Sequence, residues 1–126
     1  MKKYILSFLV MGLFTLSSCA QDKKDYLLDA TSFKKEIGTH EGQLIDIRTA
    51  AEFEEATIEG AINIDFLEDD FKAEISKIDK ATPVYIFCKS GGRSAKAYDL
   101  LKEEGFENVF ELEGGFKAWE EDSAKE

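Results

Sequence analysis

Basic residues are scarce in this sequence. Its 126 residues include 16 Lys and Arg against 26 Asp and Glu, which gives a formal net charge of −10 at pH 7. An acidic chain is poorly suited to binding nucleic acid or to docking on anionic lipid through a basic face. Any anion-binding site must therefore be local, built from backbone amides and one or two cations.

Histidine and proline occur once each. His40 lies between an expected helix and an expected strand, where a solvated loop residue is a better interpretation than a catalytic base. Pro83 directly precedes an apolar run, a position where its missing N–H does little harm to a strand. No cluster of side chains that could bind a metal is evident in the sequence, and we expect neither a metal nor a cofactor.

The N-terminus has the pattern of an export signal. Lys2 and Lys3 precede an almost wholly apolar run over residues 4–16, which is too short to be a stable membrane span. Leu16-Ser17-Ser18-Cys19 resembles a bacterial lipobox, in which the signal is cut before the cysteine and that cysteine carries lipid. We expect a protein of the bacterial cell envelope, lipid-anchored and facing the periplasm or the surface. An ordinary signal peptide, with Cys19 incidental, is the alternative.

The chain thus divides into a signal peptide at 1–18, a lipid-anchored tether at 19–25 and one domain at 26–122. Loss of residues 1–18 leaves 108 residues and removes two lysines but no acid, so the net charge moves from −10 to −12. That length suits one compact domain. With Cys19 lipidated, Cys88 has no internal disulfide partner, which is unusual for an exported protein. A buried inert cysteine is the alternative, and it fits poorly with a glycine-rich loop.

Strand-type and helix-type segments alternate along the domain. Strands are expected within 26–28, 43–47, 58–64, 84–87 and 108–112, and helices within 29–37, 50–56, 69–78, 94–104 and from 115 onward. Such alternation predicts an α/β fold with a mostly parallel central sheet flanked by helices. Sites in open α/β sheets lie beyond the carboxyl ends of the strands, and Cys88 directly follows the continuous apolar run at 84–87.

The segment after that run has the composition of a reactive-thiolate loop. Gly91 and Gly92 allow positive φ angles and a close backbone approach, so successive amides can face one point. A helix that begins at once adds its positive end to the same point. These features favour the Cys88 thiolate, which is the nucleophilic form. The remaining residues of the loop supply charges and hydroxyl donors: Lys89, Ser90, Arg93 and Ser94.

Residues 87–94 resemble the active loop of rhodanese-like sulfurtransferases. Three further segments resemble motifs of that family in family order, and together they cover about residues 27–121: 44–53, 58–64 and 112–119. The sequence departs from the family at Thr57, where many members have histidine, and at Glu59, where many have proline. Both positions lie outside the loop, so we expect altered local packing and no loss of chemistry.

The resemblance implies that Cys88 takes a sulfane sulfur from a small anionic donor such as thiosulfate. The resulting persulfide would pass its sulfur to a thiol or protein acceptor, or to cyanide in an assay. Arg93 would stabilise the substrate or the loop, and Lys89 would recruit the anion. Asp46 and Arg48 match the acid and base that the family places near the loop, with a structural salt bridge and turn cap as the alternative interpretation.

Two other functions remain open at this point. Certain phosphatases and arsenate reductases share the fold, but five residues separate cysteine from arginine in their loop, whereas four separate Cys88 from Arg93 here. The smaller ring suits sulfur better than a tetrahedral phosphate. The second alternative is a persulfide carrier or redox interaction module that delivers sulfur to a specific protein.

Overall fold

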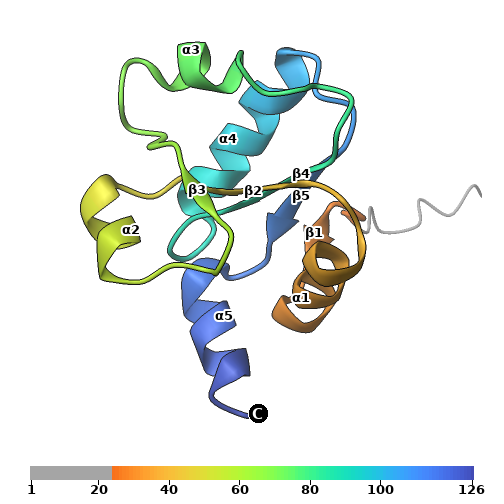
Figure 1. Cartoon of the computed structure of the whole chain (residues 1–126), viewed down its shortest axis with the longest axis vertical. Coiled ribbons are helices and arrows are strands. Elements are labelled where there is room, and N and C mark those ends of the chain that lie inside the picture. The colour runs from red at the N-terminus through yellow and green to blue at the C-terminus, as the bar shows by residue number, and fades with distance from the viewer. Residues whose placement is uncertain (1–23) are drawn as a thin grey trace, which may run out of the picture.

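The computed structural model describes residues 24–126, which form an α/β layer structure (Figure 1). The signal peptide, Cys19 and most of the tether predicted from the sequence lie outside the described residues. Strands and helices alternate along the chain: β1 Leu27–Leu28, α1 Ala30–Thr39, β2 Gln43–Asp46, α2 Ala50–Glu55, β3 Ile62–Asn63, α3 Phe71–Ile75, β4 Val84–Phe87, α4 Gly92–Glu103, β5 Val109–Leu112 and α5 Gly115–Ser123.

The five strands make one parallel sheet in the order β1-β5-β4-β2-β3. The expected mostly parallel sheet is therefore confirmed, and β4 is its central strand. Asp46 of β2 pairs in register with Phe87 of β4, and Ile86 of β4 pairs with Glu111 of β5. Since the strands are parallel, the residues that follow β2, β4 and β5 meet at one edge of the sheet.

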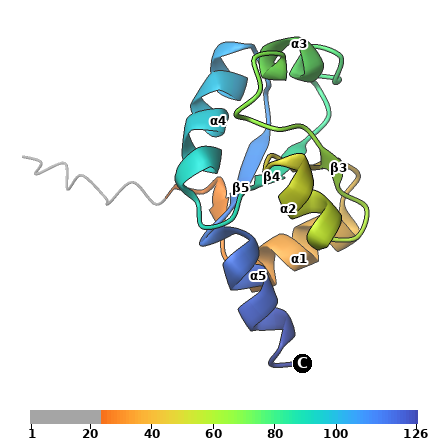
Figure 2. The same ribbon diagram turned by 90° about the vertical axis from the view of Figure 1, so that its left-hand side faces the viewer.

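Side-chain alternation along β4 divides the core into two layers. Val84 and Ile86 point to one face, which α3 and α4 cover, and Tyr85 and Phe87 point to the other, which α1 and α5 cover (Figure 2). Both faces of the strand are buried, as its unbroken apolar run predicts. Cys88 continues the alternation and belongs to the layer under α4.

Helix α3 is shorter than expected, at Phe71–Ile75 against 69–78, and two other helices have shifted boundaries next to glycines. Helix α1 passes through Gly38 and ends at Thr39, because the His40 amide still bonds to the Glu36 carbonyl oxygen at 3.0 Å. Helix α4 begins at Gly92, earlier than the expected start near 94, because Gly91 adopts a left-handed conformation (φ 109°) as its N-cap. The second difference matters for the site, since it brings the helix terminus directly against the loop.

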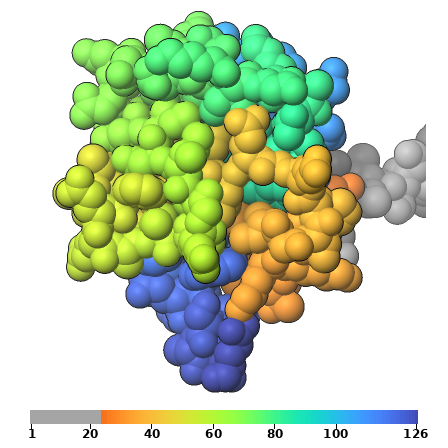
Figure 3. Space-filling view, viewed as in Figure 1, coloured from red at the N-terminus to blue at the C-terminus, as the bar shows by residue number. Residues whose placement is uncertain are grey.

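A capping box at Thr49 begins α2. Its hydroxyl accepts from the Glu52 amide at 3.3 Å, and the Glu52 carboxylate accepts from the Thr49 amide at 3.3 Å. This capping box fixes α2 beside the edge of the sheet where β2 and β4 end. The last helix, α5, projects from the bottom of the molecule in the space-filling view (Figure 3).

Candidate active site

The Cys88 sulfur lies at the centre of a ring of hydrogen-bond donors. The Gly91 amide points at Sγ from 3.1 Å, the Ser94 amide from 3.4 Å, and the Ser94 hydroxyl oxygen also lies 3.4 Å away. Gly91 supplies its amide through the left-handed turn that a residue with a side chain rarely adopts. Cys88 is 1% exposed. The arrangement is an anion cradle with the sulfur already in it.

Two opposed effects set the acidity of this thiol. Burial raises the pKa of Cys88, but hydrogen bonds from Ser94 and from the amides of Gly91 and Ser90 outweigh it, so the pKa lies below its ordinary value. A larger share of the thiol is therefore ionised at neutral pH. Because the thiolate is the nucleophilic form, the geometry favours attack by sulfur.

The start of α5 holds the loop from behind. The Phe116 amide donates to the Cys88 carbonyl oxygen at 2.7 Å, and the Lys117 amide donates to the Lys89 carbonyl oxygen at 3.1 Å. Gly115 makes this contact possible, because a Cβ there would lie 2.6 Å from the Cys88 carbonyl oxygen. Its φ of +65° is a second reason for glycine at this position. Two amides, each 28 positions later in the chain than the carbonyl it binds, thus fix the nucleophile's backbone.

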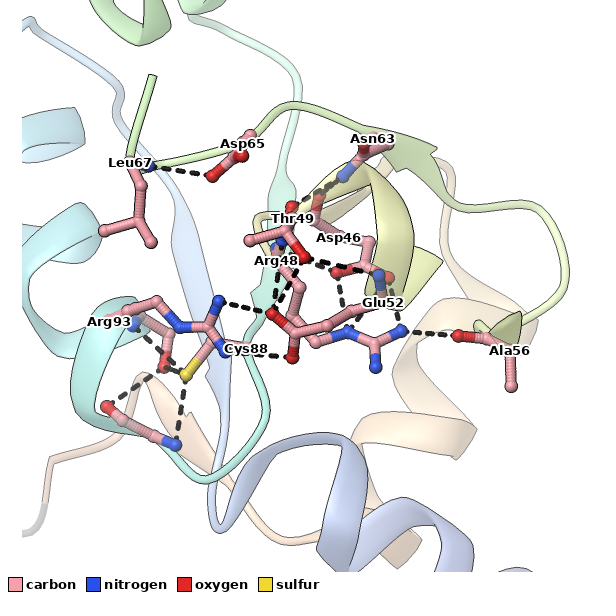
Figure 4. Close-up of polar contacts among 12 residues, drawn as sticks. Asp46, Arg48, Thr49, Glu52, Ala56, Asn63, Asp65, Leu67, Cys88 and Arg93 are labelled. Atoms are coloured by element: carbon pink, nitrogen blue, oxygen red, sulfur yellow. Dashed lines mark hydrogen bonds and ion pairs between the residues drawn. The ribbon is translucent and has the colours of Figure 1, made fainter. Parts of the chain in front are cut away.

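Arg93 turns away from the sulfur and pairs with Glu52 of α2. The two side chains make a bidentate contact, with Nη1 at 2.8 Å from Oε1 and Nη2 at 3.1 Å from Oε2 (Figure 4). The Arg93 hydrogen bond lowers the pKa of Glu52 to about 2, so the pair stays charged above strongly acid pH. Glu52 also belongs to the capping box of α2, and its partnership with Arg93 across 41 residues was not predicted from the sequence.

Asp46 and Arg48 form a buried ion pair below the loop. Arg48 Nη2 lies 2.7 Å from Asp46 Oδ2, and these side chains are 5% and 0% exposed. Thr57 donates to the same Oδ2 at 2.9 Å, and Arg48 Nη2 also donates to the Ala56 carbonyl oxygen at 2.6 Å. Of the two interpretations left open, the structural salt bridge and turn fits this geometry. Thr57, a departure from the family pattern, here serves to bind Asp46.

An open groove of about 260 Å³ borders the loop. Arg48 lines its floor, stacked on the Phe116 ring with Cζ 4.3 Å from the centroid. Charged side chains of both signs line the rest of the groove: Glu52, Glu55, Lys89, Lys117 and Glu120. Lys89 and Ser90 are exposed, as a contact surface for a substrate requires.

One buried acid near the site was not singled out from the sequence. Glu111 of β5 is 4% exposed, and its Oε1 lies 2.6 Å from the Ser94 hydroxyl oxygen. The signal was present in the strand alternation, because an acid two positions after buried Val109 shares its face.

His40, by contrast, lies on the surface against Glu36, far from any of these contacts. Within residues 24–126, no group of three or more potential ligands could hold a metal ion.

Comparison with known proteins agrees with this fold. The family model of the rhodanese-like domain matches residues 29–122, so the chain belongs to the rhodanese-like family. The solution structure of the rhodanese-like domain of an Anabaena protein superposes with a TM-score of 0.69 at 27% identity, and the match covers 77% of this chain and 74% of that one.

Two curated relatives illustrate the range of the family. The chain is 35% identical over 82 residues to the thiosulfate sulfurtransferase GlpE of Shewanella oneidensis, covering 65% of this chain and 79% of that protein. It is 38% identical over 82 residues to the uncharacterized protein YqhL of Bacillus subtilis, covering 65% of this chain. In this second case the chain spans 64% of the relative, slightly less than two thirds of its length.

Proposed function

We propose that this protein is a sulfurtransferase in which Cys88 carries the transferred sulfur as a persulfide. The observation that carries the proposal is the cradle of amides around Sγ, at 3.1 Å from Gly91 and 3.4 Å from Ser94, with the pKa of the thiol lowered. The same donors that stabilise a thiolate also stabilise the negative outer sulfur of a persulfide.

With thiosulfate as donor, the thiolate attacks the outer sulfur of the donor. The bond from Cys88 Sγ to that sulfur forms, and the S–S bond of thiosulfate breaks as sulfite leaves with the electron pair. An acceptor thiolate or cyanide then attacks the outer sulfur of the persulfide and returns Cys88 to its thiolate, which completes a ping-pong cycle. Lys89, exposed at the groove, is the group placed to meet an anionic donor.

The direct test supplies thiosulfate and cyanide to the purified protein and follows thiocyanate. A mass measurement on the Cys88 peptide should show one added sulfur atom after the donor alone. Cys88→Ser should abolish both signals, and Glu54→Gln, exposed on α2 and outside the groove, should preserve both. If neither thiocyanate nor the adduct forms with thiosulfate or with a polysulfide donor, the proposal is wrong. An adduct without thiocyanate, discharged by a protein acceptor, would favour the carrier alternative.

The phosphatase alternative receives less support from the geometry. Phosphoryl transfer relies on an arginine that reaches the phosphate oxygens. Arg93 instead makes both of its short contacts with Glu52. Hydrolysis of an aryl phosphate that disappears in Cys88→Ser would reverse this preference.

We further propose that the mature protein is lipid-anchored at the cell envelope through Cys19, on the strength of the lipobox-like sequence Leu16-Ser17-Ser18-Cys19. In the described part of the chain, no helix is long and apolar enough to cross a membrane. Labelling with radioactive palmitate should mark the wild-type protein and fail to mark Cys19→Ala. A soluble, unlipidated mature protein would contradict the proposal.

A further inference from the structure

Glu111 is a buried carboxyl group that the sulfur-transfer cycle leaves without a role. It lies on the face of β5 that α4 covers, directly behind the Cys88 loop. It is 4% exposed, and its short contact, 2.6 Å from Oε1 to the Ser94 hydroxyl oxygen, joins it to the residue whose amide and hydroxyl both approach Cys88 Sγ. A buried carboxyl group costs folding free energy, so its position next to the nucleophile calls for an explanation.

The Ser94 hydroxyl lies between the Glu111 carboxyl group and the Cys88 sulfur, and it can donate only one hydrogen bond. Its oxygen lies 2.6 Å from Glu111 Oε1 and 3.4 Å from Cys88 Sγ, while the Gly91 carbonyl oxygen at 3.2 Å is a longer, neutral competitor. If Glu111 is ionised, the hydroxyl donates to it and turns a lone pair to the sulfur, which suits a thiol. If Glu111 is protonated, it donates to Ser94, and the hydroxyl proton is free to point at a thiolate.

The same positions of the heavy atoms therefore serve two protonation states. We propose that Glu111 is the acceptor of the Cys88 proton, which reaches it through the Ser94 hydroxyl. The Sγ–H bond breaks as a new O–H bond forms on Ser94, and the original Ser94 O–H bond breaks as an O–H bond forms on Glu111. Negative charge moves from carboxylate to sulfur, and no oxidant or co-reactant is needed. Glu111 acts through Ser94, so it is a positioning residue.

The acidities of the two end groups fit this exchange. Burial raises the pKa of Glu111, while the Ser94 hydrogen bond acts in the opposite direction, and the pKa of Cys88 is lowered. Two groups whose pKa values approach one another can share one proton and titrate as a pair. Other titratable groups lie near Glu111 on the residues before β1 and on α4: Lys24, which lowers the pKa of Glu111, Asp99, which raises it, and the stacked rings of Tyr26 and Tyr98.

Glu111 also has its own route to solvent. It borders a hollow of about 250 Å³ behind the loop, lined as well by Ser90 and Gly91. This hollow shares no lining residue with the groove beside Arg48 and Lys89 on the other side. The shared proton can therefore exchange with water on the side of the loop away from that groove.

The test is a titration of Cys88 in the full chain without any sulfur donor. The rate of alkylation by iodoacetamide is followed against pH, and the product is quantified on the Cys88 peptide so that Cys19 does not contribute. The wild-type thiolate should appear in two steps, because the pair shares a proton. Glu111→Gln should give one step with its midpoint lowered by about one pH unit, or about tenfold more thiolate at acid pH. Glu113→Gln, exposed at the end of the same strand, should match the wild type.

A second pair of variants separates the relay from a charge that acts through space. In a Ser94→Ala background the hydroxyl is gone, so adding Glu111→Gln should change the midpoint far less than it does with Ser94 present. An equally large change in both backgrounds would overturn the relay. So would a Glu111→Gln titration that superimposes on the wild type.

A measurement on the wild-type protein covers the case in which Glu111→Gln fails to fold. The carbon-13 shift of the Glu111 carboxyl group should show an inflection at the same pH as thiolate formation at Cys88. Alkylation removes the Cys88 proton, so the Glu111 carboxyl group should then titrate alone and its inflection should move to another pH. An inflection that stays at the same pH after alkylation would refute the proposal. These readouts concern protonation alone, so a failure to form thiocyanate would count against sulfur transfer and leave this inference standing.

Discussion

The contact between Arg93 and Glu52 is the ion pair that ties the reactive loop to α2, and Glu52→Gln is the substitution that weakens it most selectively. Glutamine keeps the size of the side chain and one acceptor oxygen, but it removes the charge and places an N–H₂ group against the guanidinium. We expect Glu52→Gln to fold with the same structure and to lose stability at neutral pH.

The size of the loss follows from the acidity of Glu52. The Arg93 hydrogen bond takes its pKa from 4.5 to about 2, and at about 1.4 kcal/mol per pKa unit this corresponds to an upper limit of about 3 kcal/mol. The side chains of Arg93 and Glu52 are 23% and 28% exposed, so water screens part of the attraction. We therefore expect a decrease of about 1–2 kcal/mol in the free energy of unfolding.

The contribution of Glu52 to the free energy of unfolding depends on pH, and its direction follows from the lowered pKa. Because the folded-state pKa of Glu52 is depressed, its contribution is complete above the unfolded value near 4.5 and is lost as the pH falls through about 2. The difference between wild type and Glu52→Gln, measured by urea unfolding, should fall to about 40% of its neutral value near pH 3. Glu55→Gln, exposed on the same helix, should change stability by less than about 0.5 kcal/mol. A Glu52→Gln protein as stable as wild type at neutral pH would refute this account of the contact.

Three further outcomes are expected. Gly115→Ala should destabilise the fold by about 1–3 kcal/mol and slow alkylation of Cys88, because a Cβ would lie 2.6 Å from the Cys88 carbonyl oxygen at a positive φ; thermal unfolding and alkylation that both match wild type would contradict the close approach. Asp46→Asn should cost about 3–5 kcal/mol in urea unfolding, because it leaves Arg48 buried and uncompensated, and a loss below 1 kcal/mol would show that Arg48 finds water instead. Ser94→Ala should raise the pKa of Cys88, so alkylation at neutral pH should slow, whereas an unchanged rate would mean that the backbone amides alone set the acidity.

The arrangement of the sheet was predictable because the hydrophobic periodicity and the residues that end helices and strands indicate the same elements. The unbroken apolar run of β4 indicated a central parallel strand, and the cysteine directly after it had to lie at the carboxyl edge. The capping box at Thr49 was legible for the same reason, since it depends on residues three apart. Features that depend on residues close together in the chain can be predicted from the sequence.

The residues that bind the loop could not be predicted from the sequence. Arg93 binds Glu52, 41 positions away in the chain, and Ser94 binds Glu111, 17 positions away. Neither pairing follows from spacing, because each depends on how α2 and β5 pack around the end of β4. Both acids also had local explanations, as a helix cap and as an ordinary strand residue, which gave no reason to seek a distant partner.

The amide of Phe116 on the Cys88 carbonyl oxygen makes the site a late product of synthesis. When the loop leaves the ribosome, the residues of α5 that brace it have not yet emerged. The backbone of the loop is fixed only after the start of α5 has emerged as well. A truncated product that ends before β5 would therefore carry the nucleophile's sequence with an ordinary cysteine's reactivity.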